Sequence, residues 1–143
     1  LILFGGGLSL AAAIRASGVA ELLASGFAGL DTIPPWAVVV LVVAAIVFLT
    51  ELTSNTATTA TLVPLLAAVA PGLGIEPLRL VVAAALAASC AFMLPVATPP
   101  NAVVFGSGML RASDMSRAGF WLNWLGIALI SLAAQTLLVP ILG

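Results

Sequence analysis

Charged residues are scarce in this sequence. Only 6% of its 143 residues are charged, whereas 63% are hydrophobic, and the mean hydropathy is +1.31. A soluble domain carries roughly 25% charged residues because its surface must be solvated. The chain cannot cover a water-facing globule of its size, and its long uncharged runs predict an integral membrane protein.

Histidine is absent, and Cys90 is the single cysteine. Without histidine the chain lacks the commonest general base and the commonest metal ligand. One cysteine excludes an internal disulfide, and an isolated thiol makes no metal site. Ser54 would need a base to act as a nucleophile, and the chain has neither His nor Lys to supply one, so we expect no enzyme activity. The net charge of −1, without a basic cluster, gives no indication of nucleic-acid binding.

The uncharged runs are continuous and rich in Ala, Leu and Val, which predicts spanning helices rather than the alternating strands of a barrel. We therefore expect an all-α protein that crosses the cell (inner or plasma) membrane several times. The sequence starts within an apolar run, with neither an initiator Met nor a signal-peptide n-region, and we interpret it as part of a longer protein.

Residues 1–33 are predicted to form a first unit. Residues 1–14 are apolar, are interrupted by Gly5–Gly7, and resemble the end of a spanning helix, where small residues allow close packing. From Arg15 to about Leu30, apolar residues recur at helical spacing among a few charges, which predicts a short amphipathic helix at the membrane interface.

A polar segment interrupts the next apolar region. Trp36–Leu49 and Thr56–Ala70 would each extend only about 21 Å at 1.5 Å per residue, less than the roughly 30 Å hydrocarbon core. Between them lie the polar residues 50–56. Two short arms around a polar centre predict a re-entrant hairpin over residues 34–70, with its tip near the membrane midplane.

A second interruption follows within residues 78–110. Leu80–Leu94 is apolar, three prolines then occur within six residues, and Ala102–Leu110 is apolar again. Each proline removes a donor and clashes with the preceding turn, so we expect a helix that is unwound within the membrane. Residues 118–143, with an uncharged run from Phe120 to Leu142, are predicted to be the last spanning helix.

The two interruptions predict a binding site, because broken helices survive in a membrane only where they line a cavity or are buried in protein. In transporters, half-helix N-termini face anions while unwound carbonyls and helix C-termini coordinate cations. Oxygen ligands for sodium are offered by the side chains of Thr50, Ser54 and Asn55 and by carbonyls at Thr53 and Ala97. Donors for a carboxylate are offered by Asn55, Thr56 and Thr98, with Pro99 shaping the wall. No Lys or Arg lies near either break in the sequence, so a bound anion would depend on amides, helix dipoles and co-bound cations.

Each feature also has a structural interpretation. Ser54–Thr56 could be only a helix cap, and prolines kink many membrane helices without a function. Glu51, an ionisable residue at depth, is either functional or holds the hairpin through hydrogen bonds. Gly5–Gly7 fits helix packing. If the chain were a membrane scaffold without transport activity, the free-energy cost of placing two polar breaks within the membrane would have no explanation.

The residues of the two breaks also resemble a known family. Thr50-Glu51-Leu52-Thr53-Ser54-Asn55-Thr56-Ala57-Thr58, followed by Ala97-Thr98-Pro99-Pro100-Asn101-Ala102, is similar to the paired signature of the divalent anion–sodium symporters. That family includes dicarboxylate, citrate and sulfate carriers, and the match covers essentially the whole chain as the second of two inverted repeats. The resemblance implies an elevator-type carrier, usually a homodimer, with the hairpin and the broken helix in its moving domain.

The resemblance also implies roles for individual residues. One sodium ion, the coupling ion, would be held by the set Thr50, Asn55 and the carbonyls of Thr53 and Ala97. A substrate carboxylate would be bound by the hairpin-tip motif and the second break, namely Ser54, Asn55, Thr56, Thr98 and Pro99. Glu51 and Asn101 are accessory candidates. The implied function is sodium-coupled transport of divalent anions, C4-dicarboxylates such as succinate, or citrate, with no other cofactor.

One departure from the family pattern limits the prediction. The matching Ser-Asn-Thr hairpin of the first repeat is not in this sequence, so we expect a missing N-terminal half as a partner and no transport by this segment alone. Some relatives exchange dicarboxylates without sodium. A sodium-independent exchanger and a related oxyanion permease for sulfate or arsenite therefore stay open as alternatives.

Overall fold

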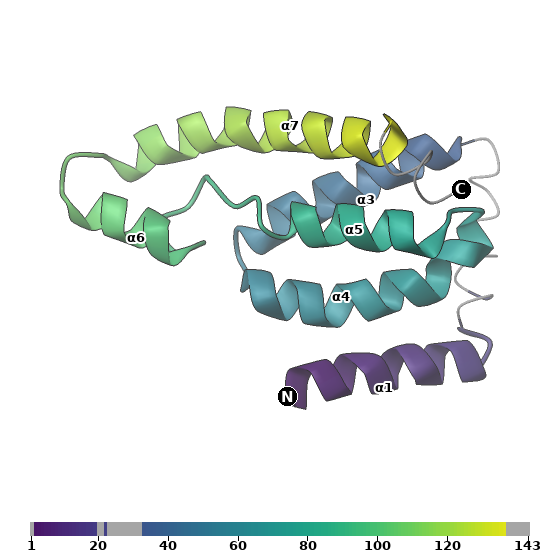
Figure 1. Cartoon of the computed structure of the whole chain (residues 1–143). Helices are drawn as coiled ribbons and strands as arrows, with labels where there is room; N and C mark the ends of the chain where they lie inside the picture. The colour runs from purple at the N-terminus through teal and green to yellow at the C-terminus, as the bar shows by residue number, and fades with distance from the viewer. Residues whose placement is uncertain (1, 20–21, 23–32, 137–143) are drawn as a thin grey trace.

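The computed structural model describes residues 2–19, 22 and 33–136, and every regular element within them is a helix (Figure 1). The all-helical prediction is confirmed for this part of the chain. The elements are α1 (Ile2–Ala16), α3 (Pro35–Thr50), α4 (Asn55–Val69), the 3₁₀ helix η2 (Ala70–Leu73), α5 (Pro77–Ala87), α6 (Pro99–Gly106) and α7 (Ala112–Thr136).

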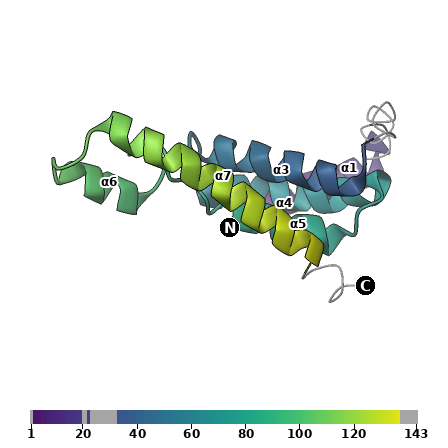
Figure 2. The same cartoon turned by 90° about the horizontal axis from the view of Figure 1, so that it is seen from above.

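Helices α3, α5 and α7 pack against one another and form the core. In Figure 2, α7 crosses this layer obliquely. The side chains facing the core recur every three or four positions, as on one face of a helix. Alanines on α5 let the neighbouring backbones approach closely. The buried residues of the three helices include Val39, Val43, Ile46, Val47, Leu80, Ala83, Ala84, Ala87, Ile127 and Ala134.

Helix α4 lies between α5 and α1. Pro64 lies inside α4 and has no N–H, so the carbonyl of Ala60 loses its helical donor. The backbone of Gly7 packs onto that carbonyl, because a Cβ at Gly7 would lie 2.3 Å from Ala60 O. The packing interpretation therefore fits Gly7, whereas a Cβ at Gly5 or Gly6 would meet no atom within 4 Å. Helix α1 continues through all three glycines rather than breaking there.

The first arm of the hairpin matches the prediction, but the second extends further. The 3₁₀ helix η2 follows α4 directly, and Gly74 ends it with a φ of +66°, a conformation that glycine adopts without strain. Two helices of the described chain are long and apolar enough to cross a membrane, namely Asn55–Leu73 and Ala112–Thr136. The expectation that the second arm is too short to span is therefore wrong by length.

Two other boundaries differ from the prediction. Helix α5 ends at Ala87, although the sequence stays mostly apolar to Leu94, and the amides of Phe92, Met93 and Leu94 bond a side chain from the segment between α3 and α4 (see below). Helix α7 begins at Ala112 rather than near residue 118, with the acidic Asp114 in its first turn, where the helix dipole favours a negative charge.

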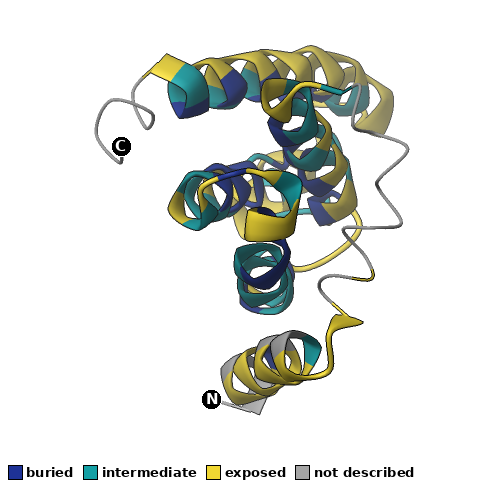
Figure 3. Ribbon diagram, turned by 90° about the vertical axis from the view of Figure 1, so that its right-hand side faces the viewer, coloured by how far each residue is buried: buried dark blue, intermediate teal, exposed yellow. Residues whose placement is uncertain are grey.

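The predicted interfacial helix lies mostly outside the described residues, as do residues 137–143 of the last predicted span. Figure 3 shows that exposed residues cover α6 and the outer side of α7, while buried residues gather where α3, α5 and α7 meet. Helix α6 has no buried residue.

Candidate functional site

The two polar interruptions meet at one end of the helical bundle (Figure 1). We call residues 51–54, between α3 and α4, the hairpin tip, and residues 88–98, between α5 and α6, the unwound segment. Together they line a cavity of about 890 Å³. Every predicted site residue lines this cavity except Thr50, which is fully buried behind it. The lining residues are Glu51, Leu52, Thr53, Ser54, Asn55, Thr56, Ser89, Ala91, Phe92, Val96, Ala97, Thr98, Pro99, Pro100 and Asn101.

Short-range hydrogen bonds close the hairpin tip. Thr53 Oγ1 donates to the carbonyl of Leu49 over 2.9 Å and lies 2.7 Å from Thr58 Oγ1. Ser54 is the N-cap of α4, and its Oγ accepts a bond of 3.4 Å from the Ala57 amide. The cap interpretation of Ser54 is therefore correct, and the capping bond leaves its hydroxyl proton available to a ligand.

The N-terminus of α4 offers donors to the cavity. No acceptor among the described residues takes the amides of Asn55 and Thr56, the first two of the helix. Free amides and the positive end of the helix dipole together attract anions. In the described structure the Thr56 hydroxyl likewise has no hydrogen bond and is exposed. This end of α4 can therefore bind a carboxylate group.

Oxygen atoms gather on the other side of the tip. Thr50 Oγ1 donates to the carbonyl of Ala88 over 3.0 Å and also contacts Asn55 Oδ1. A hydroxyl that ligates a cation must direct its proton elsewhere, and Ala88 O provides that acceptor. The carbonyls of Thr53 and Ala97 accept no hydrogen bond within the described chain. Hard cations prefer such oxygen ligands, so this set can hold a sodium ion.

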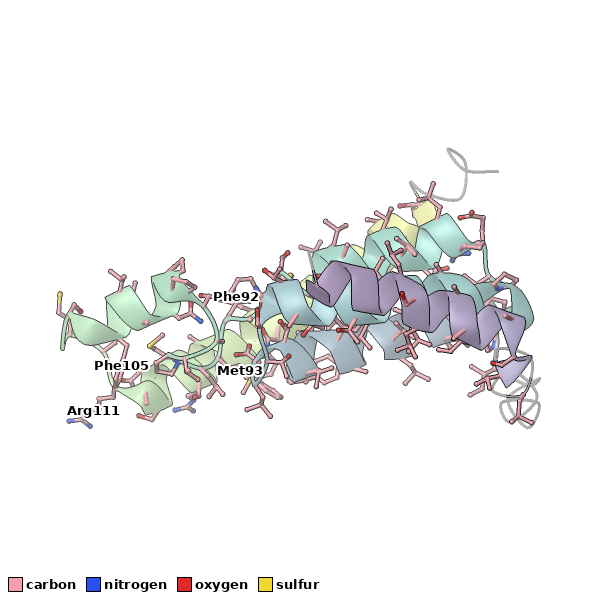
Figure 4. All side chains as sticks on the ribbon, turned by 90° about the horizontal axis from the view of Figure 1, so that it is seen from below. Phe92, Met93, Phe105 and Arg111 are labelled. Atoms are coloured by element: carbon pink, nitrogen blue, oxygen red, sulfur yellow. The ribbon has the colours of Figure 1, made fainter. Side chains whose placement is uncertain are left out.

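Glu51 reaches from the tip into the unwound segment. Its carboxylate, in a side chain only 4% exposed, accepts bonds from the amides of Phe92 (2.8 Å), Met93 (2.9 Å) and Leu94 (3.0 Å). Figure 4 places Phe92 and Met93 where the bundle meets the α6 end, with Phe105 and Arg111 farther out. Asn123 Nδ2 on α7 donates to the same carboxylate over 2.8 Å. Of the two interpretations of Glu51, the hydrogen-bonding one is what the contacts support.

Three further carbonyls of the unwound segment accept side-chain hydrogen bonds. Asn101 Nδ2 donates to Ala91 O and Leu94 O, each over 3.0 Å. Ser116 Oγ on α7 donates to Met93 O over 3.3 Å. A Cβ at Gly119 would lie 2.3 Å from Phe92 O, so only a glycine lets α7 approach this closely. Because both protons of its amide group are used, Asn101 offers the cavity an acceptor rather than a donor.

The N-terminus of α6 differs chemically from that of α4. Its first two residues, Pro99 and Pro100, have no N–H to donate. The third amide, Asn101 N, is taken by the N-cap Thr98 Oγ1 over 3.3 Å. The Thr98 hydroxyl accepts that bond and keeps its proton for a ligand. This side of the cavity thus offers one hydroxyl donor and an apolar surface, to which the exposed Val96 adds.

Sequence reasoning missed the contribution of α7. Asn123 is fully buried, and Ser116 is half-buried. A signal existed, because a polar residue such as Asn123 within an apolar span is itself a functional indicator. Ser89 also lines the cavity and was not predicted; its hydroxyl bonds back to Ala85 O over 3.4 Å.

The cavity has an unusual charge balance for a site that could bind an anion. Glu51 is the one charged residue among the described residues that line it. An anion bound at α4 would therefore face a carboxylate at the back of the site and no Arg side chain. A co-bound cation would supply the missing positive charge.

Residues 1–142 match the family model described as the sodium:sulfate symporter transmembrane region. The chain is 46% identical over 143 residues to the sodium-dependent dicarboxylate transporter SdcS of Staphylococcus saprophyticus, a match covering 100% of this chain and 28% of that protein. It is 47% identical over 141 residues to solute carrier family 13 member 2 of Rattus norvegicus, covering 99% of this chain and 24% of that protein. The chain spans about a quarter of the length of these curated relatives.

These matches confirm the resemblance of the paired signature, and they agree with an all-helical integral membrane protein. The proteins of the family are named as symporters and transporters, which supports the expectation that the chain is not an enzyme. Since the family model covers residues 1–142, the chain belongs to the sodium:sulfate symporter family.

Proposed function

We propose that this chain supplies half of the binding site of a secondary carrier that transports C4-dicarboxylates such as succinate, or citrate, together with sodium. The observation that most directly supports this proposal is the cavity between the hairpin tip and the unwound segment. It combines free amides, hydroxyls and unpaired carbonyls with a single charged lining residue, Glu51, which is acidic. Such a site suits an anion only when cations bind with it.

In this proposal one substrate carboxylate lies at the N-terminus of α4. The amides of Asn55 and Thr56 and the hydroxyls of Ser54, Thr56 and Thr98 donate to its oxygens. Donors that are already oriented before the ligand arrives lose little entropy on binding. The helix dipole adds to the attraction.

The sodium ion lies between the side-chain oxygens of Thr50 and Asn55 and the carbonyls of Thr53 and Ala97. Thr50 and Asn55 are already in contact, and the two carbonyls have no other partner among the described residues. The ion compensates both the substrate charge and the nearby Glu51. Sodium dependence in the names of the relatives supports this coupling.

The apolar wall of the cavity favours a substrate with a carbon skeleton. Val96, Pro99 and Pro100 line the side facing α6, and the two prolines have no N–H to donate there. A dicarboxylate can place methylene groups against this wall, whereas sulfate carries oxygen atoms on every side and would leave some of them unpaired. This favours dicarboxylate over the oxyanion alternative.

The chain would act within a longer carrier of the cell membrane. In that carrier α3 and α4 form a re-entrant hairpin, and the unwound segment interrupts a helix at comparable depth. Residues 1–33 belong to the scaffold side and residues 34–143 to the moving domain of an elevator mechanism in a homodimer. A second, N-terminal half completes the pocket. The much greater length of the relatives supports the existence of further segments.

Uptake of labelled succinate into proteoliposomes containing the full-length carrier tests this function. We expect uptake that requires an inward sodium gradient, that is lost in Asn55→Ala, and that persists in Leu129→Ala, a change on the exposed side of α7. Uptake driven only by internal dicarboxylate would assign the exchanger alternative. Labelled sulfate transported in place of succinate would overturn the substrate assignment.

A further inference from the structure

Helix α7 presents a polar face to the unwound segment. Ser116, Gly119 and Asn123 lie at helical spacing, and each contacts the segment or the carboxylate that holds it. Ser116 bonds Met93 O, Gly119 adjoins Phe92 O, and Asn123 bonds Glu51 Oε1. A helix that only crossed the membrane would need no polar contacts of this kind.

Burying Asn123 has a free-energy cost that a role in packing alone does not explain. Its side chain is fully buried, and its Oδ1 has no hydrogen-bond partner in the described part of the chain. A leucine of similar size would avoid burying that oxygen. What the asparagine adds is the donor Nδ2, at 2.8 Å from Glu51 Oε1. Among the described residues it is the single side-chain donor to that carboxylate, since the other three donors are the amides of residues 92–94.

We infer that Asn123 is a positioning residue for the substrate and sodium site. It fixes the carboxylate of Glu51, which fixes the amides of residues 92–94, and the site residues Ala97 and Thr98 follow a few positions later. Asn123 itself is not among the lining residues of the cavity. Helix α7 therefore sets the shape of the second half of the site from outside it.

The titratable groups near Glu51 do not replace this contact. The elements packed around it carry Cys90 in the unwound segment and Asp114 and Arg117 near the start of α7. None of the three is a hydrogen-bond partner of the Glu51 carboxylate in the described structure. The position of the carboxylate thus depends on the three amides and Asn123.

Cys90 provides a probe of the unwound segment that does not require transport. It is half-buried, and its Sγ would lie 3.5 Å from a Cβ at Gly126 on α7. In the full-length carrier, modification of Cys90 by a maleimide can be followed by mass spectrometry of the peptide that contains it. We expect Asn123→Leu to accelerate modification about tenfold or more, because a charge-assisted hydrogen bond is lost.

The transport readout is the sodium concentration for half-maximal succinate uptake. We expect Asn123→Leu to raise it about tenfold and to change it more than it changes the maximal rate. Asn123→Gln retains an amide donor and should fall between Leu and the wild type. This readout rests on the proposed function, whereas the Cys90 readout does not, so a carrier that fails to move succinate would leave the inference testable.

Ser131→Ala is the matched control. Ser131 is also buried on α7, and its Oγ also lacks a partner among the described residues. It should leave both readouts within about twofold of the wild type. The inference is overturned if folded Asn123→Leu carrier modifies Cys90 and responds to sodium as the control does. It is equally overturned if the Gln and Leu variants behave alike.

Discussion

The hairpin tip and the unwound segment line the same cavity but are stabilised in opposite ways. Within the described chain, the side-chain bonds of Thr53 and Ser54 at the tip join residues no more than five positions apart, such as Thr53 with Thr58. The unwound segment is bound mainly by distant residues. Its amides bond Glu51, 41 to 43 positions earlier, and Met93 O bonds Ser116, 23 positions later.

This difference shows which part of the site takes its conformation from nearby residues and which part depends on distant ones. Thr53 and Ser54 at the tip need only nearby sequence, because their hydroxyls bond neighbouring residues. The unwound segment has amides that would otherwise continue α5, and it stays unwound only while Glu51, Thr50 and residues of α6 and α7 satisfy its polar groups. A change at Glu51 or in α7 therefore reaches the unwound segment, whereas a change at Thr53 or Ser54 stays local.

Removing the Glu51 carboxylate should have the largest effect on stability and uptake, because this carboxylate holds the unwound segment. Glu51→Ala leaves three part-buried amides and the buried Asn123 Nδ2 without their acceptor, at up to about 1 kcal/mol each. We expect a loss of about 2–4 kcal/mol in the free energy of unfolding and no succinate uptake. Thermal unfolding of the purified full-length carrier and proteoliposome uptake measure the two effects.

The matched control is Glu76→Ala, which removes an exposed carboxylate that caps α5. It should cost only about 1 kcal/mol and leave uptake intact. Glu51→Gln, which keeps one acceptor oxygen, should fall between the two. Equal effects of Glu51→Ala and Glu76→Ala would show that the unwound segment does not depend on Glu51.

Gly119→Ala tests the close approach of α7. The added Cβ would lie 2.3 Å from Phe92 O and 2.4 Å from Phe92 C, so backbone must move. Such overpacking costs about 1–3 kcal/mol, and we expect uptake to fall about tenfold. Gly106→Ala is the control, because a Cβ there meets nothing within 4 Å. Wild-type uptake in the Gly119→Ala variant would show that the site does not depend on the close approach of α7.

The tip should respond more weakly. Thr53→Val and Thr58→Val each break the 2.7 Å contact between their hydroxyls, so a double-mutant cycle should give a coupling of about 1 kcal/mol. Thermal unfolding measures the coupling, with Thr136→Val, an exposed threonine bonded to its own helix, as the reference change. A coupling near zero would mean that the contact does not stabilise the tip.

Ser54 should give the smallest stability effect and separate capping from ligand binding. Its capping bond is long, 3.4 Å, so Ser54→Ala should cost less than about 1 kcal/mol. Ser54→Asp retains a capping acceptor but places a carboxylate where the substrate carboxylate is proposed to lie. We expect near-native unfolding with a KM for succinate raised about tenfold or more. An unchanged KM would place the substrate elsewhere.

The contrast also explains what could be predicted from sequence. The tip was placed correctly because its signals are local, a polar run between apolar arms with Ser54 as a cap. The prolines located the break but not where it ends, since α6 begins at Pro99 rather than Ala102 and both Pro99 and Pro100 occupy its first turn. The end of α5 could not be predicted, because apolar residues run on to Leu94 and the acceptor for the amides of residues 92–94 is Glu51, about 40 positions earlier in the chain.

The supporting role of α7 was hidden for the same reason. Neither Asn123 nor Gly119 belongs to a local motif, and their contacts appear only when α7 packs beside the unwound segment. Glu51 was recognised as a candidate from its depth alone. Its actual partners, three successive amides and one asparagine, could not be read from the sequence around it.

The most direct test of the central claim is the stabilisation of the purified full-length carrier by its ligands. A ligand that binds the folded state raises the unfolding temperature by an amount that grows with the logarithm of its concentration relative to its Kd. We predict that sodium and then succinate each raise this temperature in the wild type. Thr50→Val should abolish the sodium shift, and Thr56→Val should retain it while losing the succinate shift. A Thr50→Val carrier with the wild-type sodium shift, or a Thr56→Val carrier with the wild-type succinate shift, would contradict the proposed site.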